Sequence, residues 1–290
     1  MRLARALAAR GKQAAIINAD SAQVYADLHV LSARPSVDEM GGITHRLYGA
    51  WDGASACSAA DWAAAAKGEI ESAHRRGAVP ILCGGTGLYI RTLLEGIAPV
   101  PPIDPRIREQ VRAMSQDHAR SALEREDPKA AAQLAPADTA RTMRALEVIR
   151  ATGRTLKEWQ ANKTGGIESA VTLHPLILLP DRDWLYERCD RRFVHMLDGG
   201  AIAEVEALLA RDLDAALPVM RAIGVPEIQA ILEGRLSRAE AIVAGQTATR
   251  RYAKRQYTWF SHQPPAAWTR SSNNIPSVTE NFVSLLRKEP

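Results

Sequence analysis

The sequence has few cysteines and no long apolar run. Its three cysteines, Cys57, Cys83 and Cys189, lie far apart and form neither a CxxC pair nor an even-numbered set. This argues against a disulfide framework and a structural zinc site, and it favours a reducing compartment. No apolar stretch approaches membrane-spanning length, and the Ala/Arg-rich start has no secretory apolar region. We therefore expect a cytoplasmic protein without a membrane partner.

Motifs of several enzyme classes are missing as well. The chain has no GxSxG nucleophile motif and no HExxH zinc motif, and its seven histidines are scattered along the chain. The sequence therefore gives no sign of a covalent nucleophile or of a histidine-ligated metal.

Acidic residues are absent from a long segment near the C-terminus. No Asp or Glu lies between Glu240 and Glu280, although the net charge of the whole chain is only +4. The basic residues of this segment are Arg250, Arg251, Lys254, Arg255 and Arg270. A segment of one sign is typical of a polyanion-binding surface, and a solvated helix face is the alternative.

Short apolar runs indicate the fold class. The runs at 14–18 and 77–85 predict two buried strands, and a capped helix over 58–77 is predicted between them. Another helix is predicted before the first strand, within the first eleven residues. Alternating helices and strands indicate an α/β protein with a parallel sheet.

The character of the sequence changes after about residue 100. Prolines interrupt regular structure, and charged, Ala-rich helical stretches follow, before the apolar run 171–180 predicts another buried strand. We therefore predict an α/β core formed by 1–100 and 166–270 and a helical insertion over 101–165, between sheet strands. The tail 271–290 is expected to form a loop and a weak terminal helix.

Asp20 and Ser21 follow the first predicted strand directly. Ligands bind at the carboxyl ends of strands in open parallel sheets, so a carboxylate there can accept a proton and a hydroxyl can bind a phosphate or a metal. The alternative is that Asp20 only caps the next helix.

The stretch "CGGTGLYI" follows the second predicted strand. Its glycines allow a tight turn, Thr86 presents a hydroxyl, and a helix begins directly afterwards. A strand, a Gly-rich loop and a helix N-terminus together are typical of an anion site, although ordinary turns are also Gly-rich.

Three further segments carry arginines or lysines at suggestive positions. Arg250 with Lys254, and Arg251 with Arg255, lie four residues apart on a predicted helix, forming a basic stripe for phosphates. The interleaved aromatics Tyr257, Trp259 and Phe260 are interpreted as core residues. Two other candidates, for phosphate contact or ordinary surface exposure, are the pair Arg141 and Arg144 on one helix face, and Arg221 before an Ile-Gly turn.

In chain order, "IINADSAQVY", "SAADW", "PILCGGTGLYIRTLLEG", "DPRIR", "RTMRALEV", "RRFVHML", "RAIG" and "TRRYAKRQYTWF" resemble the tRNA dimethylallyltransferases. The resemblance extends from the first helix to about Phe260. It implies a P-loop NTPase-like, nucleotide-binding α/β core with a helical insertion domain that contacts tRNA. It also implies transfer of a dimethylallyl group from dimethylallyl diphosphate to N6 of the adenine 3′ of the anticodon, with Mg²⁺ as cofactor and a monomeric enzyme.

Site residues follow from the same motif matches. The matches imply that Asp20 corresponds to the general base, that Thr86 lies beside the reacting centre, and that Arg221 lies near the diphosphate and the tRNA. Ser21 and Thr86 are the expected metal-contacting hydroxyls. The residues expected to bind the tRNA anticodon stem-loop are Ser21, Ala22, Gln23, Arg108, Arg141, Arg144, Arg250, Lys254 and Arg255.

One departure from the family pattern concerns the start of the chain. The family has a strand and a GxxxxGK[ST] loop before its first helix, whereas this sequence begins within that helix at Met1. Loss of several anion-stabilising groups is expected to bring transfer close to abolition if nothing replaces them. The alternative hypothesis is therefore a tRNA-binding remnant without transferase activity. A nucleotide kinase of related fold does not explain the "RRYAKRQYTWF" match.

Overall fold

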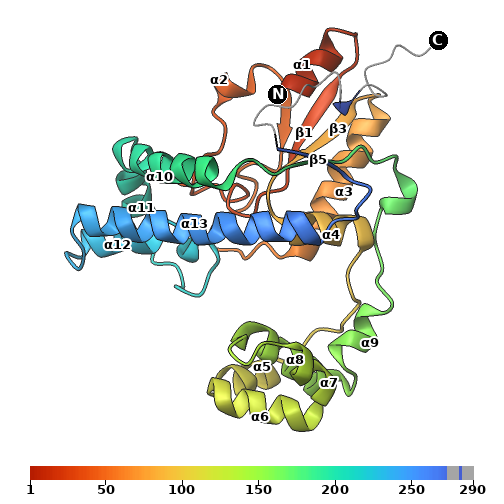
Figure 1. Ribbon diagram of the computed structural model, residues 1–290, viewed down its shortest axis with the longest axis vertical. Helices are drawn as coiled ribbons and strands as arrows, with labels where there is room; N and C mark the ends of the chain where they lie inside the picture. The colour runs from red at the N-terminus through yellow and green to blue at the C-terminus, as the bar shows by residue number, and fades with distance from the viewer. Residues whose placement is uncertain (273–280, 283–290) are drawn as a thin grey trace. The chain divides into compact units, whose positions relative to one another are not determined.

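The computed structural model describes residues 1–272 and 281–282 (Figure 1). The chain divides into two compact units. The larger unit contains 1–93 and the described residues from 171 onward, and the smaller unit contains 94–170. The predicted insertion 101–165 falls within the smaller unit, whereas most of the predicted tail 271–290 lies outside the described residues.

The first part of the larger unit forms a parallel sheet. Its elements are α1 (Arg2–Ala8), β1 (Ala14–Asn18), α2 (Val37–Met40), β2 (Thr44–Arg46), α3 (Ala59–Arg75), β3 (Val79–Cys83) and most of α4 (Gly87–Glu95), whose last two residues are counted with the smaller unit. β1 is the central strand of the order β2-β1-β3, and both its partners run parallel to it. Its apolar residues Ala15, Ile16 and Ile17 are buried, which explains why this run forms the middle strand.

Helix α3 packs against strands β1 and β3 of the sheet. Ser58 accepts a hydrogen bond from the Asp61 N–H, and the Asp61 carboxylate accepts one from the Ser58 N–H, so a capping box starts the helix. Trp62, in the first turn of α3, is fully buried and stacks on Tyr89 of α4 with 4.6 Å between the ring centroids. The predicted helix and its cap are therefore confirmed.

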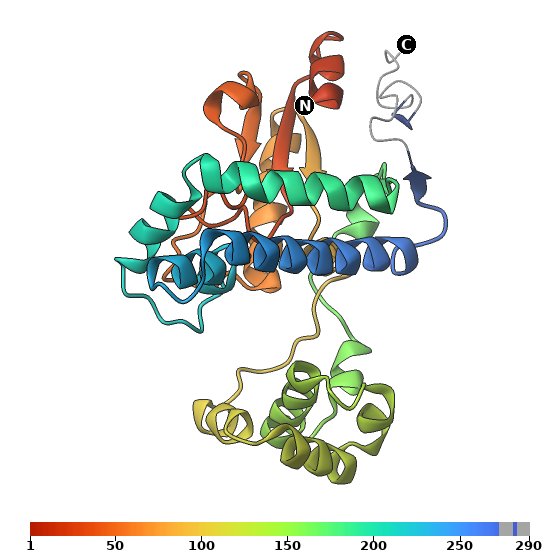
Figure 2. The same cartoon turned by 60° about the vertical axis from the view of Figure 1, so that its left-hand side comes forward.

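The second part of the larger unit is mainly helical. Its elements are β4 (Leu176–Leu178), α10 (Arg182–Asp198), α11 (Ala201–Leu209), the 3₁₀ turn η2 (Val219–Arg221), α12 (Val225–Leu232), α13 (Arg238–His262) and β5 (Thr269–Ser271). Helices α10 and α13 lie side by side in both ribbon views (Figure 2). An ion pair between Arg250 of α13 and Asp190 of α10, with a shortest N···O distance of 2.6 Å, joins the two helices.

The smaller unit is a helical bundle with its own core. It contains α5 (Pro105–Arg112), α6 (Gln116–Glu126), α7 (Pro128–Gln133), α8 (Thr139–Thr152), α9 (Leu156–Gln160) and the 3₁₀ turn η1 (Glu168–Ala170). Val111, Leu123 and Leu146 are fully buried and pack in one cluster. Arg112 and Arg144 both contact the buried carboxylate of Glu147, at 3.0 Å and 3.6 Å.

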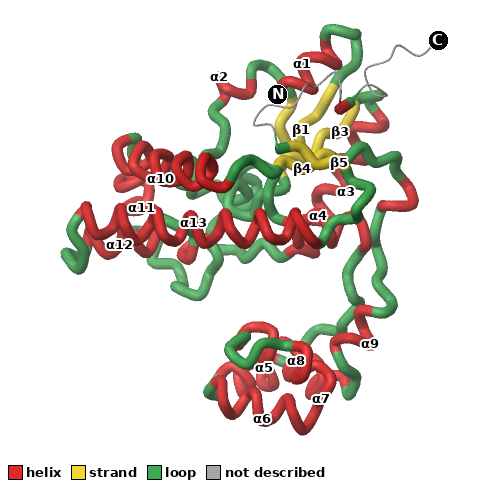
Figure 3. The backbone as a smooth tube through the Cα atoms, viewed as in Figure 1, coloured by secondary structure: helices red, strands yellow, loops and turns green. Residues whose placement is uncertain are grey.

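The sheet differs from the sequence prediction in two respects. The run 171–180 was expected to join the main sheet, but β4 pairs with β5 in a separate parallel sheet of two strands (Figure 3). The short strand β2 was missed altogether. Its sequence, Thr-His-Arg, is polar and only three residues long, so it contains no apolar run that would predict a strand.

Gly245 tests the packing of α13 on α10. A Cβ atom placed there would lie 2.0 Å from Cζ of Phe193 on α10, and this rigid, buried ring has little freedom to move. We predict that Gly245→Ala lowers the free energy of unfolding by about 1–3 kcal/mol, because the overpacking outweighs the better helix propensity of alanine. Guanidinium chloride denaturation measures this change.

Gly68, in the middle of α3, is the matched control, since a Cβ there meets nothing within 4 Å. Gly68→Ala should leave the stability unchanged or raise it by up to about 1 kcal/mol. Equal effects of the two substitutions would contradict the predicted packing.

Candidate active site

Asp20 follows β1 and lies at the carboxyl edge of the sheet. Its carboxylate Oδ1 accepts a hydrogen bond of 2.8 Å from the N–H of Ala22, which closes a tight turn after the strand. The next helix, α2, begins only at Val37 and is capped by Ser36. The alternative that Asp20 serves as a helix cap is therefore wrong.

The electrostatic setting of Asp20 favours a proton acceptor of increased basicity. Burial raises the pKa of the Asp20 carboxyl above its ordinary value, because the charged form loses hydration. Hydrogen bonds from the N–H groups of Ala22 and Gln23 and the positive charge of Arg192 act in the opposite direction and lower this pKa. Perturbed carboxyls of this kind are concentrated at functional sites.

Thr86 joins the loop after β3 to the loop after β1. Its Oγ1 accepts a hydrogen bond of 2.9 Å from the Ser21 N–H and donates one of 3.2 Å to Ser21 Oγ. Tyr252 of α13 lies beside the same two hydroxyls. Burial raises its pKa, and hydrogen bonds to Thr86 and Ser21 lower it. Three distant segments thus meet next to Asp20.

Glycines allow the loop after β3 to approach its neighbours closely. A Cβ at Gly84 would lie 2.2 Å from the carbonyl carbon of Ala19, and a Cβ at Gly87 would lie 2.4 Å from the ring of Trp259. The main chain of Gly85 accepts a hydrogen bond of 2.9 Å from Gln256 of α13. Side chains here would therefore separate α13 from the sheet edge.

A cavity of about 770 Å³ opens beside Asp20 within the larger unit. Ser21, Ala22 and Gln23 line it together with apolar side chains of the β1 loop, β4, α10 and α13. Four arginines also line it: Arg188, Arg192, Arg221 and Arg255. A mainly apolar chamber with one carboxylate and several arginines suits a ligand that has an apolar part and an anionic part.

One wall of the cavity is held by a carboxylate from α11. Glu204 accepts hydrogen bonds from three consecutive N–H groups, those of His29, Val30 and Leu31, at 2.5, 2.8 and 2.9 Å. Leu31 lines the cavity, and its side chain packs against Gly224. The α11 helix is thereby docked onto the loop that follows Asp20.

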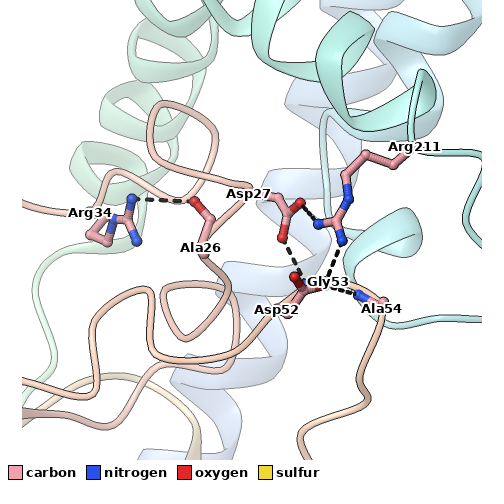
Figure 4. Close-up of polar contacts among 7 residues, drawn as sticks. All are labelled: Ala26, Asp27, Arg34, Asp52, Gly53, Ala54 and Arg211. Atoms are coloured by element: carbon pink, nitrogen blue, oxygen red, sulfur yellow. Dashed lines mark hydrogen bonds and ion pairs between the residues drawn. The ribbon is translucent and has the colours of Figure 1, made fainter.

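Arg211, just after α11, makes a second connection to the same wall (Figure 4). Its guanidinium contacts Asp27, whose side chain is only 9% exposed, and also Asp52 at 2.6 Å. The other oxygen of Asp27 accepts a hydrogen bond of 2.8 Å from the Gly53 N–H. These contacts fix the segment that leads to η2, which ends at Arg221.

The remaining basic residues expected to bind RNA occupy different settings. Lys254 is exposed on α13, whereas the Arg250 guanidinium is engaged by Asp190. In the smaller unit, Arg108 is exposed on α5, and Arg141 of α8 is 77% exposed while paired with Asp138 at 3.1 Å. Arg144 contacts Glu147, as described above.

The aromatic residues of α13 differ from the sequence prediction. Tyr257 and Phe260 were interpreted as core residues, but both line the cavity and neither is fully buried. Trp259 packs over Gly87 and against the edge of Phe260, with 4.8 Å between ring centroids. The aromatic face of α13 therefore forms part of the chamber wall.

No preformed cage for a metal ion is present in 1–272 and 281–282. These residues contain no cluster of three or more His, Cys, Asp or Glu side chains suited to a metal. They also contain no helix that is long and apolar enough to cross a membrane.

Comparison with known proteins identifies the family. A family model described as IPP transferase matches residues 23–263. This chain belongs to the IPP transferase family. A tRNA dimethylallyltransferase of Erythrobacter litoralis is 69% identical over 270 residues, which cover 93% of this chain and 85% of the relative. One from Novosphingobium aromaticivorans is 65% identical over 278 residues, covering 96% of this chain and 99% of the relative.

Solved structures of the IPP transferase family share this fold. The full-length tRNA isopentenylpyrophosphate transferase of Bacillus halodurans is 30% identical, with a TM-score of 0.66 and coverage of 97% of this chain and 89% of its own. A eukaryotic dimethylallyltransferase described as acting on tRNA is 26% identical, with a TM-score of 0.72 and coverage of 89% and 66%. The predicted P-loop NTPase-like α/β fold is confirmed.

Two cavity residues of this member of the IPP transferase family are not predicted from the sequence: Arg188 and Arg192. Arg188 and Arg192 are four residues apart and therefore share one face of α10, a signal that was available in "RDWLYERCDRRFVHML". Nothing in the sequence distinguished this face of α10 from a solvated one. Only the packing of α10 beside α13 turns it toward the cavity.

Glu204→Gln tests whether α11 holds the cavity wall. A neutral amide has one acceptor oxygen and presents its NH₂ group to the remaining donors, so we predict faster hydrogen exchange at His29, Val30 and Leu31. Since hydrogen bonds to charged groups contribute about 1.5–3 kcal/mol, the loss of protection should be about tenfold or more. Exchange measured residue by residue checks it.

Glu206→Gln, at an exposed position of the same helix, is the matched control and should leave these three amides unchanged. Unaltered exchange in Glu204→Gln as well would show that the carboxylate does not hold the wall.

Proposed function

We propose that this chain transfers a dimethylallyl group from dimethylallyl diphosphate to N6 of the adenine 3′ of the anticodon in tRNA. The observation that carries the proposal is the Asp20 carboxylate at the wall of an apolar cavity lined by four arginines. Relatives of 65–69% identity carry the name tRNA dimethylallyltransferase, which favours this function over that of an inactive tRNA-binding protein.

The reaction requires a proton acceptor near the adenine. As N6 attacks C1 of the dimethylallyl group, the N–C bond forms, the C–O bond to the diphosphate breaks, and N6 must lose a proton. Asp20 accepts that proton in our proposal. Its raised pKa suits this task, because a carboxylate that is harder to ionise is also a stronger base.

The leaving diphosphate requires positive charge. Arg221 was expected near it from the sequence, and Arg188, Arg192 and Arg255 line the same cavity. We assign these guanidinium groups to the diphosphate, since several cations beside one site stabilise charge that develops on a leaving group. The apolar part of the chamber accepts the prenyl chain.

Mg²⁺ fits the residues present if the diphosphate provides much of its coordination. Magnesium typically takes one or two protein oxygens and fills its other positions with phosphate oxygens and water. Ser21 and Thr86 are the hydroxyls assigned to it, and they lie beside Asp20. When bound, the ion neutralises charge on the departing diphosphate.

Recognition of tRNA is assigned to two regions, the cavity beside Asp20 and a set of basic residues outside it. The adenine must leave its stack to reach Asp20, and Ser21, Ala22 and Gln23 border the space that would receive it. The side-chain nitrogen of Gln23 already donates to the carbonyls of Ser32 and Ala33, so we assign its oxygen to the ligand.

Basic residues outside the cavity would contact the RNA backbone. In the proposal these residues are Arg250 and Lys254 on α13 and Arg108, Arg141 and Arg144 in the smaller unit. Arg255 of α13 lines the cavity and is assigned to both the diphosphate and the tRNA. We further propose a monomeric enzyme of the cytoplasm that acts on the anticodon stem-loop.

Asp20→Asn tests the proposed base. The amide cannot accept the N6 proton, so the transfer rate should fall by about 10²–10⁴-fold while the KM for RNA changes little. In the unsubstituted protein, the acid limb of the pH–rate profile should lie above the ordinary aspartate pKa of 3.8. Activity should decrease as pH falls through that limb, because protonation removes the acceptor.

Single-turnover transfer of labelled dimethylallyl to an anticodon stem-loop measures these rates. Asp38→Asn, at an exposed position of α2, is the control for loss of one carboxylate and should behave as the unsubstituted protein does. Near-normal transfer by Asp20→Asn would refute the assignment.

Lys254→Ala tests the basic surface of α13. A lysine that contacts one phosphate contributes about one released counterion, so the slope of log affinity against log salt concentration should become shallower by about 1. Fluorescence anisotropy with a labelled stem-loop between low and physiological salt gives this slope.

Lys67→Ala removes one exposed lysine from α3 and thus alters net charge by the same amount. It should leave the slope unchanged. Identical slopes for both variants and the unsubstituted protein would remove Lys254 from the interface.

A further inference from the structure

Asn18, the last residue of β1, is a polar side chain that is 0% exposed. Buried amides persist where they are fully hydrogen-bonded. Its Nδ2 donates to the main-chain carbonyl of Asp20 at 3.0 Å and to that of Leu47 at 3.1 Å. Its Oδ1 accepts from the N–H of Asp20 at 2.9 Å.

This one side chain therefore binds both main-chain polar groups of Asp20. The residues around it are fixed by other contacts, because the Ala19 N–H donates to the Cys83 carbonyl at 2.9 Å and the Thr86 N–H donates to the Ala19 carbonyl at 3.1 Å. Asp20, in contrast, lies beyond the end of β1, so no neighbouring strand binds its main-chain N–H and carbonyl groups. The Asn18 side-chain amide binds them instead.

The arrangement requires a donor and an acceptor on the same short side chain. Asparagine supplies both. An aspartate at this position would turn an acceptor oxygen toward the carbonyls of Asp20 and Leu47, and an alanine would leave three main-chain groups without their present partner. The hydrogen-bonding groups of asparagine, and not only its side-chain volume, therefore suit position 18.

We propose that Asn18 is a positioning residue for transfer, orienting the Asp20 carboxylate toward the adenine amino group. The inference rests on the proposed function. Because Asn18 is fully buried, it acts on the reaction through the main chain that it binds, at Asp20 and at Leu47. Displacement of a reacting group by about 1 Å can cost about 10²-fold in rate, so modest freedom in the Asp20 main chain has a measurable effect.

Trp62 provides a structural control at the same place. Its Nε1 donates to the main-chain carbonyl of Asn18 at 2.8 Å, and it makes no hydrogen bond to the Asn18 side chain. Trp62→Phe removes that buried hydrogen bond while leaving the contacts between Asn18 and Asp20 intact. It therefore separates lost stability from lost positioning.

The test compares Asn18→Ala, Asn18→Asp, Asn18→Ser and Trp62→Phe in the full chain. Single-turnover transfer to the anticodon stem-loop gives the maximal rate and the RNA concentration for half-maximal rate, and thermal denaturation gives stability. We expect Asn18→Ala and Asn18→Asp to reduce the maximal rate by about 10–100-fold, with less than a twofold change in that RNA concentration.

Asn18→Ser should recover part of the rate, because a hydroxyl can accept from the N–H two residues later. Trp62→Phe should lower the melting temperature and keep the rate of the folded protein within about twofold of normal. If Asn18→Ala does not fold, the same comparison is made with Asn18→Asp and Asn18→Ser.

Two results would overturn the inference. One is a normal maximal rate in Asn18→Asp and Asn18→Ser, and the other is an equal loss of rate in Trp62→Phe, which would reduce Asn18 to a structural role. A separate result would point to the proposed function instead: full activity of Asp20→Asn would show that Asp20 is not the base, whatever the Asn18 variants do.

Discussion

The parallel pairing of β1 with β3 is the constraint on which the site depends. The register places Asn18 opposite Cys83, so both strands end at the same level. Asp20 and Ser21 emerge from one strand and Thr86 from the loop after the other. Without this alignment, the hydrogen bonds between Thr86 and Ser21 would not form, and the turn that presents the carboxylate would lose its support.

The charged groups around the cavity also affect one another. One carboxylate is held where burial raises its pKa, and the guanidinium of Arg192 opposes that rise. In the proposal, Arg192 is also one of the arginines that bind the leaving diphosphate. A site with a neutral wall would leave Asp20 more basic but would offer nothing to a diphosphate.

The sequence predicted the strands and helices whose signals are local. Apolar runs located β1 and β3, and Ser58 with Asp61 located the start of α3. Strands β2 and β5 were not predicted. Each is a polar segment of only three residues and forms a strand because it pairs with a neighbouring strand. Local pattern carries no information about such partners.

The residues of the candidate site likewise fall into those with a local sequence signal and those without one. Asp20, Ser21 and Thr86 were found because they follow strands at the edge where ligands bind. Arg188, Arg192 and the aromatic lining of α13 were missed or misread, since amphipathic helices look alike whether their polar face meets solvent or a cavity. The packing of α10 and α13 decides that question, and it depends on contacts between residues far apart in the sequence.

The measurement that most directly tests the central claim is transfer by this chain itself. Labelled dimethylallyl diphosphate, Mg²⁺ and an anticodon stem-loop with adenine 3′ of the anticodon are incubated with the folded protein, and the RNA is analysed by mass spectrometry. We predict one added dimethylallyl group, on N6 of that adenine, and none when guanine replaces it. Salt-sensitive binding of the RNA with no modified product would contradict the claim and identify the protein as a tRNA-binding protein without transferase activity.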